Sequence, residues 1–441
     1  MARAKKEAAL TPEERLQAAL VPDWEWPYKL PGNWCWTYLT KAAECLDNFR
    51  KPINATERAG RNGNVPYYGA TGQVGWIDDF LTDEDLVLLG EDGAPFLDLI
   101  KDKAYLITGK AWVNNHAHIL RSLFGDTGNR YLLHYLNSFN YAGYVNGTTR
   151  LKLTRASMDT IPIPLPPLAE QQRIVDRIES LFAKLDEAKE KAQAVVDSFE
   201  TRKAAILHKA FTGELTAKWR EEHGVRMESW EVRTLDSVCS SIFDGDHMPP
   251  PKAESGIPFL VISNVNTGHL TFENTRFVPQ EYYDTLSDTR KPQLGDVLYT
   301  LVGSFGIPVV VNSKRPFCFQ RHMALLRPID VSPQFLWYIL QTPEMYDKAS
   351  SIATGTAQLT VPIKGLRAMT IPRPKTAEQV EIVRILDGFF AREQSAKEAA
   401  EAVLDQIELM KKSILARAFR GELGTNDPNE ESAVELLKQI I

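Results

Sequence analysis

The sequence predicts an α+β protein in which two mixed α/β domains are separated by two long coiled-coil helices. Two observations support this prediction. A helical segment occurs twice, at residues 169–216 and 377–424, and the segments before each copy are rich in aromatic residues, glycine, proline and β-branched runs. The 441 residues also suffice for two domains of ~150 residues plus connections.

The repeat aligns without a gap and gives 23 identities in 48 positions. Ordinary residue frequencies would give roughly three. The copies begin "AEQQRIVDRIESLF" and "AEQVEIVRILDGFF", and they end "ILHKAFTGEL" and "ILARAFRGEL". Because proline cannot continue a helix, the preceding "IPIPLPPL" and "IPRPKT" set the N-terminal ends. We expect spacer helices within residues 166–216 and 374–424.

Apolar residues in both copies follow one another at alternating steps of four and three, which is the pattern of a coiled-coil seam. Glu393 is the one break in the second copy. Two such seams most simply pack on each other, and the alternative is a pair of ordinary core helices. A helix of about 43 residues would be roughly 65 Å long at ~1.5 Å per residue. The second seam is predicted to contain Ile382, Leu386, Phe389, Ala396, Ala400, Val403, Ile407, Met410 and Ile414.

The remaining segments divide into two divergent domains and three short connections. Both domains open on a Trp-led phrase, "WCWTYLTKAAEC" and "WEVRTLDSVC", and both close on an aromatic stretch followed by a Gly-Thr turn. Between those ends the two sequences scarcely resemble each other. The predicted parts are an N-terminal helical segment (1–21), a first domain (22–165), a linker (217–227), a second domain (228–373) and a C-terminal tail (425–441).

The charge balance and the cysteine pattern limit the class of protein. The formal net charge is −6, and residues 21–160 hold 14 basic against 16 acidic residues, so phosphate contacts do not dominate the composition. Four cysteines without a CxxC pair predict a reduced, cytoplasmic protein without structural zinc. No apolar run reaches the ~18 residues of a membrane span.

A search for catalytic motifs finds none. The phrase "YLITGKA" lacks the first glycine and the hydroxyl residue of a phosphate-binding loop, and no Asn-Pro-Pro-aromatic sequence is present. The "NNHAH" at residues 114–118 lacks nearby cysteine or carboxylate ligands, which favours a polar loop over a metal site. "FDGDHMPPP" is more typical of a contact loop than of an acid/base centre. We therefore predict no catalytic residue and no metal site.

Polar loops carry the recognition chemistry instead. "RNGNVPYYGATGQVGW" (61–76), "NVNTGH" (264–269) and "FQRHMALL" (319–326) combine amides, aromatic residues, arginine and glycine. Asparagine and glutamine can bind adenine bidentately, and arginine can read guanine. For each loop taken alone, a polar turn beside a sheet is the favoured interpretation. Their occurrence in two divergent domains favours recognition.

These residues together resemble a known family. "IPIPLPPLAEQQRIVDRIESLF" with a heptad helix and "AFTGEL", repeated after a second variable domain, is similar to the specificity (S) subunit of Type I restriction–modification enzymes. "PYYGATGQVGWIDDF", "GDVLYTLVGSFG" and "QRHMALLRP" extend the resemblance over essentially the whole chain. The second junction departs from the pattern, with "RPKTAEQVEI" where the first has "LPPLAEQQRI".

The resemblance implies two target-recognition domains, each reading one half of a split, asymmetric DNA sequence. It further implies that the two helices pack antiparallel, relate the domains by a pseudo-twofold axis and fix the gap between half-sites. The subunit would be non-catalytic and would bind no cofactor itself. Two modification subunits would supply S-adenosylmethionine binding and adenine N6 methylation, and two restriction subunits would add ATP- and Mg²⁺-dependent translocation and cleavage.

Candidate residues follow from the loops and the helix ends. Two other functions stay open: a standalone DNA methyltransferase or nuclease, and a coiled-coil scaffold that binds only proteins. The candidate DNA-binding residues are Asn62, Asn64, Tyr67, Tyr68, Gln73, Asn114, Asn115, His116, Asp246, His247, Asn264, Asn266, Ser304, Arg321 and His322. The candidates for the modification-subunit interface are Phe182, Phe211, Phe389, Phe390 and Phe419, with burial in the coiled coil itself as the equal alternative.

Overall fold

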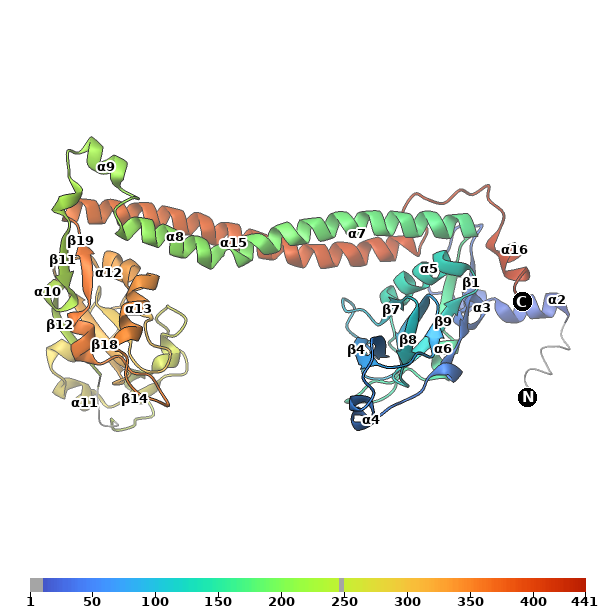
Figure 1. The fold of residues 1–441 in the computed structure, drawn as a ribbon, viewed down its shortest axis with the longest axis horizontal. Helices are drawn as coiled ribbons and strands as arrows, with labels where there is room; N and C mark the ends of the chain where they lie inside the picture. The colour runs from blue at the N-terminus through green and yellow to red at the C-terminus, as the bar shows by residue number, and fades with distance from the viewer. Residues whose placement is uncertain (1–10, 246–249) are drawn as a thin grey trace. The chain divides into compact units, whose positions relative to one another are not determined.

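The computed structural model describes residues 11–245 and 250–441, which form two compact units (Figure 1). Unit 1 comprises Met1–Gln193 and Glu401–Ile441, and unit 2 comprises Ala194–Ala400. Each unit therefore contains one globular domain, part of the first repeat helix and part of the second. Within the described ranges, no helix is long and apolar enough to cross a membrane.

The repeats form the long helices that the sequence predicts, with one interruption. The first copy is divided into α7 (Leu168–Asp197) and α8 (Phe199–Phe211), whereas the second is the single helix α15 (Thr376–Ala418). The division falls at Ser198, whose hydroxyl donates to the carbonyl oxygen of Ala194. Such a bond back to the preceding turn bends helices. The sequence predicted one continuous first helix, and the structure interrupts it at Ser198.

In unit 1, α7 runs alongside the C-terminal half of α15 in the antiparallel sense (Figure 1). Lys189 Nζ lies 2.6 Å from a carboxylate oxygen of Glu408, and Lys411 Nζ lies 2.5 Å from one of Asp186. The residue earlier in α7 pairs with the residue later in α15, as antiparallel packing requires. The expectation of antiparallel helices is confirmed within this unit.

The seam of α15 differs in detail from the predicted one. Val403 and Met410 are 44% and 49% exposed. The neighbouring Leu404 is half-buried, so the packed face is shifted by one residue there. Glu393, the break in the apolar pattern, is bound within unit 2 by Arg202 at 2.7 Å. An ion pair therefore replaces one apolar layer of the seam.

Domain 1 contains three sheets. The large sheet is antiparallel in the order β2-β9-β6-β7, the small sheet has the order β4-β3-β8-β5 with β3 and β8 parallel, and β1 pairs with β10. Its strands are β1 (Cys35–Tyr38), β2 (Ala43–Cys45), β3 (Val65–Gly69), β4 (Gly72–Ile77), β5 (Thr82–Asp83), β6 (Leu86–Gly90), β7 (Ala104–Ile107), β8 (Lys110–Val113), β9 (Ala117–Ser122) and β10 (Pro162–Leu165). The helices of unit 1 besides α7 and α15 are α2 (Pro12–Ala19), α3 (Leu39–Ala42), α4 (Ala55–Ala59), α5 (Gly125–Ser138), α6 (Arg155–Asp159) and α16 (Ala433–Lys438).

Domain 2 repeats this plan. Its sheets have the orders β12-β18-β15-β16, β14-β13-β17 and β11-β19, and β13 runs parallel to β17. Its strands are β11 (Glu231–Thr234), β12 (Cys239–Asp244), β13 (Ile257–Leu260), β14 (Arg276–Val278), β15 (Val297–Thr300), β16 (Pro308–Val310), β17 (Cys318–Phe319), β18 (Met323–Pro328) and β19 (Thr370–Arg373). Its helices besides α8 and α15 are α9 (Ala217–Glu222), α10 (Leu235–Val238), α11 (Gln280–Thr285), α12 (Pro333–Leu340), α13 (Pro343–Ile352) and α14 (Ile363–Ala368).

The two domains thus share a topology that their sequences conceal. In both, the Trp-led opening strand pairs antiparallel with the proline-containing strand before the repeat helix: β1 with β10, and β11 with β19. In both, a four-stranded antiparallel sheet is accompanied by a second sheet built around one parallel pair. The mixed α/β class and the internal repeat are therefore confirmed for both domains.

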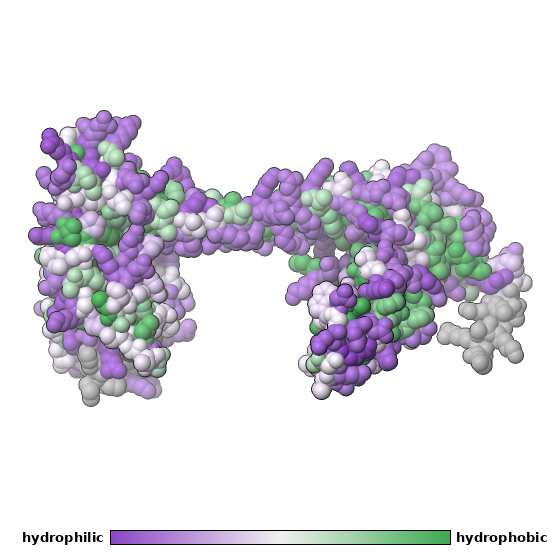
Figure 2. Space-filling view, in the orientation of Figure 1, coloured by the Kyte–Doolittle hydropathy of each residue, from purple (hydrophilic) through white to green (hydrophobic). Residues whose placement is uncertain are grey.

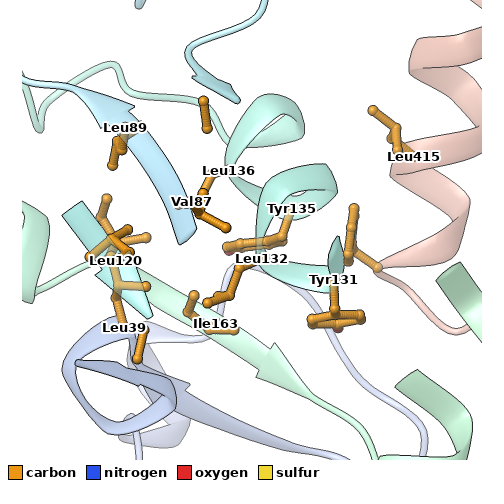
Figure 3. Close-up of a cluster of buried hydrophobic side chains, with 14 of the residues drawn as sticks. Leu39, Val87, Leu89, Leu120, Tyr131, Leu132, Tyr135, Leu136, Ile163 and Leu415 are labelled. Atoms are coloured by element: carbon orange, nitrogen blue, oxygen red, sulfur yellow. The ribbon is translucent and has the colours of Figure 1, made fainter. Parts of the chain in front are cut away.

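The core of unit 1 joins domain 1 to α15. Four residues of α5, Tyr131, Leu132, Tyr135 and Leu136, lie between the large sheet and Leu415 of α15 (Figure 3). All four are at most 4% exposed. Since full burial of a large apolar side chain contributes about 1.5–3 kcal/mol, this cluster holds the domain firmly against the helix.

A buried glutamate near the start of each repeat helix binds the segment that follows the other repeat. Glu378 accepts hydrogen bonds from the hydroxyl of Thr216 (2.7 Å) and from Arg220 (2.6 Å) in unit 2. Its counterpart in unit 1, Glu170, accepts one from the hydroxyl of Thr425 (2.6 Å). The C-terminal tail therefore binds the start of the first repeat helix in unit 1, just as the 217–227 linker region binds the start of the second repeat helix in unit 2.

Candidate nucleic-acid interface

A short segment crosses from the small sheet to the large sheet in domain 1. It comprises Asn114, Asn115 and His116, between the end of β8 and the start of β9. The Asn114 amide donates to the carbonyl oxygen of Tyr68 on β3 (3.1 Å), and the Glu91 amide donates to that of His116 (2.8 Å). Backbone hydrogen bonds therefore fix both ends of this crossing segment.

Domain 2 has the same segment in Gln320, Arg321 and His322, between β17 and β18. The Gln320 amide donates to the carbonyl oxygen of Leu260 on β13 (3.1 Å), and the Leu301 amide donates to that of His322 (2.8 Å). The bonds match those of domain 1 one for one. Residues 114–116 and 320–322 are therefore structurally equivalent.

A tight hairpin flanks each crossing segment, at residues 146–152 and 354–360. Gly147 has φ +108° and Gly355 has φ +112°, a region that glycine enters without strain. A Cβ at either glycine would lie 2.5 Å from a carbonyl oxygen of its own hairpin. In both domains this hairpin is bound to the loop after the central strand of the large sheet. The bonds run from Gly93 N to Leu151 O (3.0 Å) and from Gly303 N to Leu359 O (3.0 Å).

The predicted residues of domain 1 fall into two groups. Tyr68 and Gln73 face each other across β3 and β4, beside the crossing segment that contains Asn115 and His116. Gln73 and Asn115 are exposed, and His116 is half-buried. Asn62 and Asn64 are also exposed but precede β3, at the end of that strand away from the crossing segment.

Three predicted residues have structural roles. Tyr67 is 1% exposed and donates from its hydroxyl to the carbonyl oxygen of Ile53 (3.3 Å). Asn114 is 7% exposed, and its side chain accepts from the His116 amide (2.8 Å). Asn264 is 3% exposed and caps the turn that follows β13. These roles within the fold account for all three side chains, and contact of Tyr67, Asn114 or Asn264 with DNA stays a prediction.

Domain 2 places Arg321, His322 and Ser304 at the surface that corresponds to the crossing segment and hairpin of domain 1. Arg321 and His322 lie in the crossing segment, and Ser304 follows Gly303, which is bound to the hairpin 354–360. Ser304, Arg321 and Asn266 are exposed, and His322 is half-buried. Two further candidates, Asp246 and His247, lie outside the described residues.

The two histidines have different electrostatic surroundings. His116 Nδ1 lies 2.7 Å from a carboxylate oxygen of Asp92, and the same oxygen lies 2.6 Å from Arg150. His322 has no such carboxylate among its described contacts. Desolvation and the charge of Arg321 lower the pKa of His322 from 6.5, so this imidazole is neutral at neutral pH.

A buried charge network supports the crossing segment of domain 1. His118, 1% exposed, directs Nδ1 to Asp47 (2.7 Å) and Nε2 to the carbonyl oxygen of Leu153 (3.0 Å). Arg50 binds Asp47 at 3.0 Å and also contacts Glu91. Burial would raise the pKa of both carboxyls, but hydrogen bonds and the neighbouring cations lower it below the ordinary value.

The same network contains one group of potential metal ligands. Cys45, Asp47 and His118 place ligand atoms within 4.8 Å of one another. The guanidinium of Arg50 already neutralises Asp47, and His118 hydrogen-bonds directly to this carboxylate. Burial raises the pKa of Cys45 to about 12, so its thiol stays protonated and is a poor ligand. Ion pairing therefore accounts for this cluster.

Basic side chains that the sequence did not single out lie on one aromatic ring of a small sheet, Trp112, and on two rings of loops, Phe80 and Phe272. In domain 1, Lys51 and Arg61 stand 5.7 and 4.6 Å from the ring centroid of Trp112, and Lys110 stands 4.5 Å from that of Phe80. In domain 2, Arg315 stands 4.9 Å from the ring of Phe272. Cations held in this way suit contacts to phosphate. Sequence spacing gave no signal for them, because each ring is about 30 or more residues away along the chain from its cation.

All five phenylalanines proposed for partner contact touch an aromatic ring of their own unit. Phe419 is 2% exposed, so the prediction of partner contact is wrong for this residue. The other four are half-buried, and for them it stays a prediction. The contacts are Phe419 with Tyr131 and Tyr135, Phe211 with Phe335, Phe390 with Tyr338, Phe182 with His134, and Phe389 with Phe390.

Exposed apolar side chains on α15 are a better match to a docking surface. Most of the visible surface of the repeat helices is hydrophilic, with small hydrophobic patches (Figure 2). In unit 1, Val403, Leu409 and Met410 are 44%, 52% and 49% exposed. We call these three residues the α15 patch.

Two equivalent polar surfaces on two α/β domains, each packed on repeated helices, define a protein built to contact two separate parts of a target. The family model described as "Type I restriction modification DNA specificity domain" matches residues 46–196 and 227–404. These ranges cover most of both domains and much of both repeat helices. The chain belongs to this family, and it is a specificity component of type I restriction–modification rather than an enzyme.

Known relatives agree with this assignment. The chain is 27% identical over 336 residues to the type I restriction enzyme EcoKI specificity subunit of Escherichia coli K12, which covers 70% of each chain. It is 26% identical over 373 residues to a Haemophilus influenzae protein named "Putative type I restriction enzyme specificity subunit", or 83% of this chain and 90% of that one.

Two solved structures share the fold. One is described as the basis of complex assembly and conformational transition of the type I R-M system, with a TM-score of 0.66 and 21% identity. The other is the HsdS subunit of Thermoanaerobacter tengcongensis, with a TM-score of 0.58 and 21% identity. Both alignments cover 90% of this chain and 100% of the other chain.

Proposed function

We propose that each domain reads one half of a bipartite, asymmetric site in double-stranded DNA through its crossing segment and the loops beside it. The observation that carries this proposal is the equivalence of residues 114–116 and 320–322. The same backbone bonds hold both segments, yet their exposed side chains differ at Asn115 and Arg321. A common scaffold with different polar side chains is what two readers of different sequences require.

The basic side chains that lie on aromatic rings would supply the sequence-independent part of the affinity. Lys51, Lys110 and Arg315 are exposed and rest on aromatic rings. Phosphate contacts of this kind position a protein on the duplex, whereas base contacts supply the specificity. A net charge of −6 is compatible with this arrangement, because the cations need only gather on the reading side of each domain.

The repeat helices would set the spacing between half-sites. Helix α15 continues for 43 residues and contributes to both units. A helix spans a fixed length of ~1.5 Å per residue, whereas a flexible linker samples a range of distances. A fixed spacing is what a bipartite target demands.

The helices would also dock the partner subunits. We expect two modification subunits, which would carry S-adenosylmethionine, and two restriction subunits, which would use ATP and Mg²⁺, in an assembly located in the cytoplasm. The α15 patch supports a docking role for this helix, since exposed apolar side chains on an otherwise hydrophilic surface mark contact sites.

A pull-down with the modification subunit tests the docking proposal. Val403→Glu and Met410→Glu should each weaken capture at least tenfold, because a charge would be buried against an apolar partner surface. Asp405→Lys changes an exposed residue of the same helix and serves as the control. Equal capture by all variants would remove the α15 patch from the interface.

Methylation mapping of host DNA, with the gene present and deleted, tests the reading function. We expect a split, asymmetric motif with N6-methyladenine on both strands that disappears on deletion. Unchanged methylation with the modification subunit expressed would favour a scaffold that binds only proteins. Methylation by the purified chain alone would instead favour a standalone enzyme.

A further inference from the structure

The crossing segments share one residue type and differ in another. Position by position, Asn114 corresponds to Gln320, Asn115 to Arg321, and His116 to His322. The chain has only eight histidines among 441 residues, so a histidine at any given position has a chance of about 2%. Two divergent domains that place a histidine at one equivalent position therefore indicate a task common to both.

In His116, the ring atom available for a contact with a target is Nε2. Its Nδ1 is bound to Asp92 (2.7 Å), its amide to Asn114 and its carbonyl oxygen to Glu91. No bond to Nε2 is found among the described residues, and the side chain is 38% exposed. In the neutral imidazole a proton on Nδ1 leaves the lone pair on Nε2, which then accepts hydrogen bonds.

His322 presents the same ring from the same backbone position. Its carbonyl oxygen is bound by Leu301, and its half-buried ring forms no hydrogen bond with another described residue. The adjacent Arg321 lies in the same turn and is exposed, whereas the His322 ring is half-buried, so the two side chains differ in accessibility. The lowered pKa of His322 keeps its ring neutral, and a neutral imidazole is an acceptor rather than a phosphate-binding cation.

Each crossing segment therefore offers two side chains, the histidine and the residue before it, for separate contacts. We propose that His116 and His322 each accept a hydrogen bond from the exocyclic amino group of a base that both half-sites contain. Asn115 and Arg321 read base pairs that differ between the half-sites. Adenine and cytosine are the bases that offer such an amino group in the major groove. This inference rests on the proposed function, because it assigns roles within the same reading surfaces.

The experiment uses the complex with its modification subunits and measures competition binding. Each competitor duplex carries one substituted base pair of the mapped target. His116→Ala and His322→Ala should each weaken binding of the native target about 3- to 10-fold, the range for one neutral hydrogen bond. Each should abolish discrimination at one base pair of its own half-site, and that base pair should be the same in both halves. Asn115→Ala and Arg321→Ala, the matched controls, should relax positions that differ between the halves.

Conservative variants separate recognition from folding. His116→Gln and His322→Gln keep an acceptor oxygen and should restore at least half of the lost discrimination, whereas a structural role for the ring would not be rescued in this way. Loss of discrimination at unrelated base pairs in the two halves, or a uniform loss for every sequence, would overturn the inference alone. A wild-type complex without sequence preference would overturn the proposed function as well.

Discussion

Replacing Glu378 with alanine is expected to destabilise unit 2 by about 3–5 kcal/mol, the usual cost of removing one partner from a buried ion pair. Glu378 is 1% exposed and accepts hydrogen bonds from Thr216 (2.7 Å), Arg220 (2.6 Å) and Trp230 (2.8 Å). The change would leave the Arg220 guanidinium, with 10% of its side chain exposed, without a carboxylate. For a unit of about 200 residues, each kcal/mol corresponds to roughly 2–4 °C, so the transition should fall by about 6–20 °C.

Differential scanning calorimetry of the whole chain measures this effect. Glu170→Ala removes the counterpart in unit 1 and should shift the other transition, so the two variants together assign the transitions to the units. The control is Arg384→Ala, which breaks an ion pair with Glu381 on the surface of α15, where 69% of the arginine side chain is exposed. It should cost less than about 1 kcal/mol. A loss for Glu378→Ala no larger than that of the control would refute the account of this residue.

Three further predictions follow from burial and charge. Phe419→Ala should destabilise unit 1 by about 3–5 kcal/mol because the ring is 2% exposed, whereas the half-buried Phe389→Ala should cost less; equal shifts in calorimetry would contradict this packing. The lowered pKa values of Asp47 and Glu91 contribute stability that is present above the ordinary pKa values of 3.8 and 4.5 and is lost as pH falls through the lowered ones. Urea unfolding between about pH 3 and pH 7 should show this loss, and Asp47→Asn should flatten it; an unchanged profile would argue against the network. Lys51→Ala should weaken DNA binding equally for all sequences and reduce the salt slope by about 1, and a sequence-dependent loss in titrations at several salt concentrations would show a base contact instead.

The repeat helices were predictable because a heptad pattern over more than 40 residues leaves little freedom in secondary structure. The residues that form the packed face of α15 were less predictable. Val403 and Leu404 are adjacent and both apolar, so the pattern admits either register, and only burial shows that Leu404 is the more enclosed. The interruption at Ser198 depends on a side-chain hydrogen bond that spacing does not encode.

The candidate site was predictable in part. The polar stretches "NNHAH" and "FQRHMALL" gave Asn115, His116 and Arg321, which the structure leaves accessible in the two crossing segments. The same composition also gave Tyr67 and Asn264, which are buried, because residue type alone does not distinguish a loop surface from a strand interior. The equivalence of the two crossing segments lies in backbone hydrogen bonds between distant segments, which a sequence comparison does not show even though both segments contain a histidine.

Binding to duplexes with altered spacing tests the central claim most directly. Once the target is mapped, the complex is titrated with DNA in which the gap between unchanged half-sites is lengthened or shortened by one to five base pairs. The proposed fixed spacing between the domains predicts full affinity at one gap length and a loss of at least tenfold when the gap changes by several base pairs. Equal affinity at every gap length would show that the half-sites are not held at a set distance, and it would contradict the account of the repeat helices.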